Sequence, residues 1–156
     1  MDLYLALKVL HVIGAAILFG TGIGIAFFLF RAERTESLPA IAATLRTVVV
    51  ADYVFTATAA VAQPLTGFLL AYLGGYGLAQ TWIWASLALY VLIGACWLPV
   101  VVLQIRMRDL AAQAVAAGAE AFPPRYYRLS RLWFWLGWPA FLSMLIIFWL
   151  MIAKPA

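Results

Sequence analysis

The chain has 156 residues, of which 67% are hydrophobic and only 10% are charged, whereas a soluble domain is roughly 45–50% apolar and 25% charged. This composition excludes an ordinary soluble enzyme and indicates an integral membrane protein, which we expect to be a single transmembrane domain over residues 1–156. The net charge of +4 comes from arginines grouped near helix ends. Such grouping is typical of contacts with anionic lipid headgroups, and we expect no nucleic-acid partner.

Four apolar stretches lie at about 3–30, 41–73, 81–106 and 128–153. Each approaches or exceeds the roughly 20 residues that a helix needs to cross the hydrocarbon core, which predicts an all-α, integral membrane four-helix bundle. Arginines follow the first and third stretches, while the connection GGYGLAQT after the second has no charge. The positive-inside rule therefore predicts a multi-pass protein of the bacterial inner membrane with both the N and C termini in the periplasm.

The first stretch carries the only histidine of the chain, His11, one helical turn after Lys8. The segment begins with Asp2 and lacks the basic start of a signal peptide, so we expect it to remain as a transmembrane helix. With a rise of about 1.5 Å per residue, His11 lies ~12 Å inside the outer end of this helix. Small residues from Gly14 to Gly24 permit the close approach of another helix or of a flat ligand.

The second stretch has polar residues on both sides of Pro64, which removes a backbone donor and is expected to kink the helix. Because this helix runs antiparallel to the first, Gln63 and Thr66 fall at the depth of His11. The sequence therefore predicts one polar pocket below the periplasmic surface of the membrane, formed by His11, Lys8, Gln63 and Thr66.

Asp52 lies in the same stretch, nearer the basic loops. A carboxylate within a membrane is costly enough to be a functional candidate by default. Two interpretations remain open: an ion pair with a basic residue such as Arg46, Arg31 or Arg131, or a catalytic, proton-handling role.

The third stretch begins with tryptophans typical of an interfacial belt and contains Pro99 and the single cysteine, Cys96, so no intrachain disulfide can form. It is expected to continue into the cytoplasm as an alanine-rich helix to about residue 120, with the proline pair 123–124 as its end. The fourth stretch starts in a basic and aromatic girdle.

Only a few kinds of functional site are possible at His11. One histidine, one cysteine at another depth and a few carboxylates do not supply the three or four ligands of a zinc site, and the parts of a serine-type catalytic triad are absent. A single intramembrane histidine can, however, bind haem iron axially. The other interpretation is that His11 is a hydrogen-bonded residue between helices and that Lys8 extends to the headgroups.

Two runs, LKVLHVIGAAILFGTGIGIAFF and AVAQPLTGFLLA, resemble a family of small bacterial integral membrane proteins of unknown function. More remotely, the first helix is similar to the HemJ-type protoporphyrinogen oxidases and the CopD-like copper-resistance domains, which open with a comparable lysine, apolar pair and histidine. This resemblance implies His11 as the axial ligand of haem b and Lys8 as its functional companion. The first helix lacks the proline-arginine pair and second histidine of the HemJ type, so the resemblance implies porphyrin binding rather than protoporphyrinogen oxidation.

The sequence thus predicts a membrane-embedded b-type haem protein that acts in redox chemistry with a quinone or a porphyrin-like substrate. In this hypothesis His11 is the metal ligand, Lys8, Gln63 and Thr66 also contact the haem, and Lys8 and Asp52 are the catalytic candidates of an oxidoreductase. The alternative is a non-catalytic accessory subunit or assembly factor, whose glycine-rich and aromatic faces pack in a homo-oligomer or a larger inner-membrane complex.

Overall fold

The computed structural model describes residues 2–35, 37–77 and 79–155, and every regular element among them is helical. The elements are α1 (Leu3–Glu33), α2 (Leu38–Ala51), the π-helix η1 (Asp52–Thr56), α3 (Ala57–Leu73), α4 (Thr81–Ala116) and α5 (Pro124–Ala153). Since α2, η1 and α3 run on without a break from Leu38 to Leu73, the chain has four helices long and apolar enough to cross a membrane. The predicted all-α membrane bundle is confirmed.

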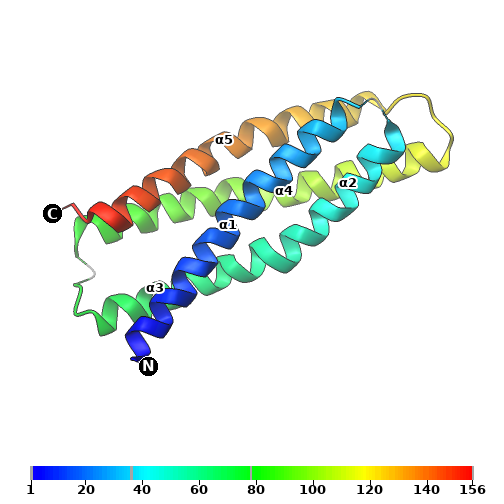
Figure 1. Ribbon diagram of the computed structural model, residues 1–156. Helices are drawn as coiled ribbons and strands as arrows, with labels where there is room; N and C mark the ends of the chain where they lie inside the picture. Colours follow the sequence, from blue (N-terminus) through cyan, green and yellow to red (C-terminus); the bar gives the residue numbers. More distant parts are fainter. Residues whose placement is uncertain (1, 36, 78, 156) are drawn as a thin grey trace.

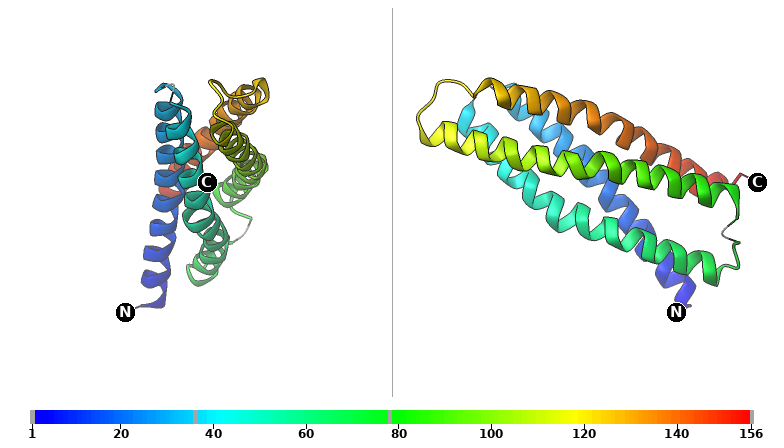
Figure 2. Two further views of the ribbon diagram at one scale, coloured as in Figure 1. Left: turned by 90° about the vertical axis from the view of Figure 1, so that its right-hand side faces the viewer. Right: turned by 180° about the vertical axis from the view of Figure 1, so that it is seen from behind.

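The four long helices run alternately up and down, so that both termini lie at one end of the bundle (Figure 1). We call this end the terminal end, and the opposite end, which carries Arg31, Arg34, Arg125 and Arg128, the basic end. The helix α1 packs against α2 and α3, and α4 packs against α5 and α2. Because α3 hardly contacts α4, the two halves separate toward the terminal end, as Figure 2 shows.

The ends of the helices follow from capping residues and shift several of the expected bounds. The Asp2 carboxylate accepts the Tyr4 N–H at 3.2 Å and caps α1. The helix α4 ends at Ala116, before the expected position near 120, because Gly118 adopts a φ of +64° and closes a Schellman turn. The proline pair does not end this helix: Pro123 is the N-cap of α5 and Pro124 its first residue, so α5 starts four residues before the expected 128.

The tightly packed core lies toward the basic end. Leu29, Leu45, Met107 and Ala111 have no exposed surface there and bring α1, α2 and α4 together. Glu33 of α1 accepts two hydrogen bonds of 2.8 Å from hydroxyls of α5, one of them from the buried Tyr126. These contacts hold α1 against α5 where the helices converge.

Most other apolar side chains point outward. Large hydrophobic residues are at least 40% exposed along all four long helices, which is the surface that a bilayer solvates. Pro64 lies inside α3 and cannot donate to the Ala60 carbonyl, so that group needs another donor. The Tyr90 hydroxyl of α4 donates to it, which satisfies the carbonyl inside the membrane.

Candidate functional site

The predicted association of His11 with the second transmembrane helix is present in the structure. His11 Nδ1 lies 2.8 Å from Thr66 Oγ1, and Gln63 Nε2 donates to the His11 carbonyl oxygen at 2.8 Å. Gln63 is buried, while His11 and Thr66 are half-buried at the edge of the α1–α3 contact. Three of the four residues expected in the polar pocket therefore meet, from positions more than 50 residues apart in the chain.

The hydrogen bonds of Thr66 favour one tautomer of His11. A threonine hydroxyl has a single proton, and Thr66 Oγ1 donates it to the Ala62 carbonyl oxygen at 2.8 Å. With the Thr66 proton on this carbonyl, the tautomer of His11 that is protonated at Nδ1 satisfies both groups. In the neutral imidazole, Nε2 is left as a base with a free lone pair.

Two glycines permit this arrangement. A Cβ atom at Gly67 of α3 would lie 3.3 Å from His11 Cε1, so the imidazole ring rests directly on the α3 backbone. A Cβ atom at Gly14 of α1 would lie only 2.5 Å from Gln63 Nε2. Each helix thus has a glycine where the other helix places its polar side chain, in agreement with the small-residue packing expected from the sequence.

Lys8 does not join this network, and the prediction of a four-residue pocket is corrected in that respect. Its side chain is exposed, and it forms no hydrogen bond or ion pair with the residues that the structure describes. Its charge acts instead on Tyr76 at the terminal end, together with the stronger effect of Lys154. The physical reason is the solvation cost of a lysine charge, which directs the flexible side chain toward the headgroups.

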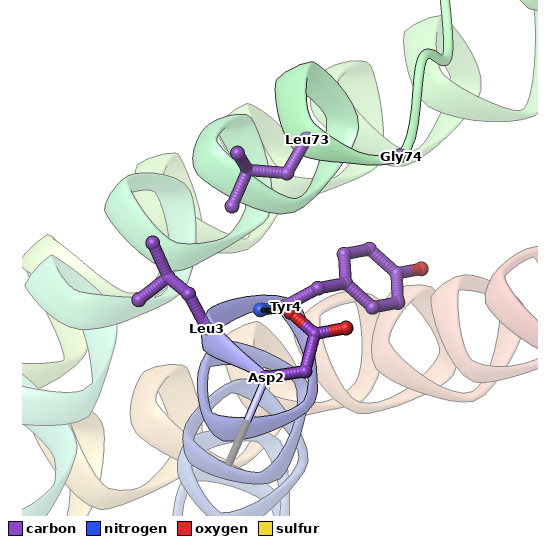
Figure 3. Close-up of a pocket in the computed structure, with 5 residues that line it drawn as sticks. All are labelled: Asp2, Leu3, Tyr4, Leu73 and Gly74. Carbon is purple, nitrogen blue, oxygen red and sulfur yellow. Dashed lines mark hydrogen bonds between the residues drawn. The ribbon is translucent and has the colours of Figure 1, made fainter.

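A pocket of about 400 Å³ lies at the terminal end of the same α1–α3 contact. Figure 3 shows Asp2, Leu3 and Tyr4 from the start of α1 facing Leu73 and Gly74 from the end of α3. Tyr4 lies seven residues before His11, about 10 Å along the helix. The pocket is therefore separate from the imidazole.

Asp52 lies in η1 and is buried, with 4% of its surface exposed. Trp97 of α4 donates to Asp52 Oδ1 over a long 3.5 Å contact, and the side chains of Thr56 and Gln104 adjoin the carboxylate. Sequence reasoning missed these three neighbours. Of the three, only Gln104 could have been identified from the sequence, because it is the one uncharged polar residue in the otherwise apolar run CWLPVVVLQI.

The expected ion pair of Asp52 with an arginine is wrong for the described part of the chain, where Arg108–Asp109 is the one ion pair present. Arg46 precedes Asp52 by six residues, which places it about 120° around the helix, and it is exposed. Arg31 is too distant: the register of His11 with Thr66 puts Asp52 level with Ile25, about 9 Å along α1 from Arg31.

In residues 2–35, 37–77 and 79–155, no three side chains of histidine, cysteine, aspartate or glutamate come together. A metal at His11 would therefore need further ligands from a cofactor, from solvent or from another chain.

Comparison with known proteins identifies the family to which the chain belongs. No curated protein and no solved structure shows significant similarity to it, so the remote similarity to HemJ-type and CopD-like proteins stays a prediction. A family model described as predicted integral membrane protein (DUF2269) matches residues 5–155, nearly the whole chain. The protein therefore belongs to this family of predicted integral membrane proteins.

Proposed function

We propose that this integral membrane protein is a b-type haem protein of the bacterial inner membrane, with its termini in the periplasm and His11 as an axial ligand of the iron. The observation that carries the proposal is the 2.8 Å hydrogen bond between His11 Nδ1 and Thr66. Ligating histidines usually donate their second ring N–H to an oxygen acceptor, which orients the ring and leaves the other nitrogen free to bind. His11 has this arrangement.

The surroundings of His11 agree with a flat, anionic ligand. Gly67 lets the imidazole rest against α3, and Gln63 anchors the His11 backbone, so the ring has little freedom to turn. Lys8, one turn nearer the terminal end, supplies a positive charge that can neutralise a carboxylate of the ligand. His11 is the only histidine, so a second axial imidazole would have to come from another chain.

Bound haem would supply one-electron transfer at the iron. The protein would then exchange electrons with a quinone or a porphyrin-like substrate as a membrane oxidoreductase. The roles of the chain are to hold the ring of His11 in one tautomer and to keep the positive charge of Lys8 near the membrane surface.

The test is an ultraviolet-visible spectrum of protein purified from haem-replete cells, before and after reduction with dithionite. We expect a b-type α-band that is absent in His11→Ala. Thr66→Val removes the hydroxyl that orients the ring and should weaken haem binding about 10- to 100-fold. Thr58→Val is the matched control, because Thr58 lies on the same helix but bonds only to the carbonyls of Val54 and Phe55.

Colourless wild-type protein would refute the proposal, as would a spectrum that His11→Ala leaves unchanged. Either result would favour the alternative hypothesis, that the protein is an accessory subunit. It predicts that mild-detergent purification recovers a partner protein in stoichiometric amount and that His11→Ala does not affect the recovery.

A further inference from the structure

A second polar cluster, separate from His11, lies inside the bundle where η1 meets α4. Three of its side-chain oxygens are buried and have no hydrogen-bond partner: Asp52 Oδ2, Thr56 Oγ1 and Gln104 Oε1. The three residues are only 4%, 8% and 1% exposed. Buried polar atoms are almost always paired, and three orphaned oxygens in one cluster indicate a shared binding role.

The unpaired hydroxyl of Thr56 distinguishes it from the other threonines of its transmembrane helix. Four other threonines of the same transmembrane helix donate to the carbonyl four residues before them: Thr44, Thr47, Thr58 and Thr66. Thr56, which lies in η1, does not. Single-turn π-helices occur frequently at functional sites.

The oxygens of the cluster adjoin one another without forming hydrogen bonds of ordinary geometry. Thr56 and Gln104 adjoin the Asp52 carboxylate, yet Oγ1 and Oε1 hydrogen-bond neither to it nor to any other described group. Oxygen ligands lie roughly 2.3–2.6 Å from a hard cation. Two such ligands at a right angle to each other are therefore about 3.4 Å apart, which is longer than an ordinary hydrogen bond between oxygens. Trp97 occupies Oδ1 of the carboxylate, which leaves Oδ2 for such a ligand.

The charge of the cluster selects the charge of the ion. Arg46 of α2 and Arg106 of α4, the arginines nearest to Asp52 and Gln104 along their helices, are exposed, and Asp52 has no ion pair within the described ranges. One buried carboxylate is neutralised by one monovalent cation, whereas a divalent ion would leave a positive charge uncompensated in a medium of low dielectric constant.

We propose that Asp52, Thr56 and Gln104 form an intramembrane binding site for one sodium ion. A proton on Asp52 would also neutralise the carboxylate and, together with the hydroxyl proton of Thr56, would pair the three oxygens, but it would give no dependence on sodium concentration. A sodium ion contacts all three. The site lies on helices η1 and α4, whereas the proposed haem ligand lies on α1, so the two proposals stand independently.

The test is binding of radioactive ²²Na⁺ to the detergent-purified protein at constant ionic strength, with choline as the replacement ion. We expect saturation at one ion per chain. Asp52→Asn, which keeps the side-chain size, should weaken binding at least 100-fold, and Thr56→Val and Gln104→Met at least tenfold each. Ser86→Ala is the control, since this buried hydroxyl already donates to a backbone carbonyl of α4.

Each variant is first checked for folding by size-exclusion chromatography and far-ultraviolet circular dichroism, and Thr56→Val provides the decisive comparison if Asp52→Asn does not fold. Wild-type protein that shows no saturable sodium binding, with tryptophan fluorescence that responds to pH alone, would overturn the proposal in favour of a protonated Asp52. Sodium binding that survives both Asp52→Asn and Thr56→Val would also overturn it. His11→Ala should leave sodium binding unchanged.

Discussion

Replacing Gly14 by alanine tests the contact that joins the first two transmembrane helices. The new Cβ atom would lie 2.5 Å from Gln63 Nε2, a distance that no real structure tolerates, so the Gln63 side chain would have to move. Gln63 then loses its 2.8 Å hydrogen bond to the His11 carbonyl oxygen. A buried polar group left unpaired costs about 1–3 kcal/mol.

Gly22→Ala in the same helix is the matched control, because nothing lies within 4 Å of a Cβ atom there. Both substitutions gain the same helix propensity, about 1 kcal/mol for alanine over glycine, and this gain cancels when the two are compared. Gly14→Ala should therefore be less stable than Gly22→Ala by about 1–3 kcal/mol.

The assay is unfolding of the detergent-solubilised protein by increasing SDS, followed by circular dichroism and near-ultraviolet absorbance. The double variant Gly14→Ala with Gln63→Ala removes the clashing amide, so its stability should exceed the sum of the two single effects. Equal stability of Gly14→Ala and Gly22→Ala would refute the reasoning, since Gln63 would then not lie against Gly14 in the folded protein.

Three further outcomes are expected, the first two in the same unfolding assay. Tyr90→Phe leaves the Ala60 carbonyl without a donor inside the membrane, and we expect a loss of about 1–3 kcal/mol; an unchanged midpoint would contradict this bond. Glu33→Leu removes the acceptor of two α5 hydroxyls and should destabilise the protein by a similar amount, about 1–3 kcal/mol, whereas Glu33→Gln, which keeps one acceptor oxygen, should cost less. The hydrogen bond and charge of Lys154 lower the pKa of Tyr76 from 10.0, so the folded state should gain a little stability as pH rises from that lowered pKa toward 10.0. Absorbance at 295 nm, measured against Tyr76→Phe, should show an early titration that Lys154→Met moves to higher pH.

The membrane character, the number of crossings and the level of the polar residues could be predicted from the sequence. Composition alone separates this chain from soluble proteins. The depth of a residue follows from a constant rise per residue, so two antiparallel helices bring Gln63 and Thr66 level with His11 whatever their side chains are. The end of α4 before Gly118 and the start of α5 at Pro124 also have local signals in the sequence. The proline pair, however, was assigned to the end of the wrong helix.

Rotation of each helix about its axis was decided only by the tertiary structure. Depth does not determine which way a side chain faces, because that depends on packing between segments far apart in the chain. Lys8 lies only one helical turn from the His11 network and yet turns outward, since its charge is better solvated there. Asp52 faces Trp97 and Gln104 instead of an arginine. The π-turn η1 that begins at this residue leaves no pattern in the sequence that a regular helical period would reveal.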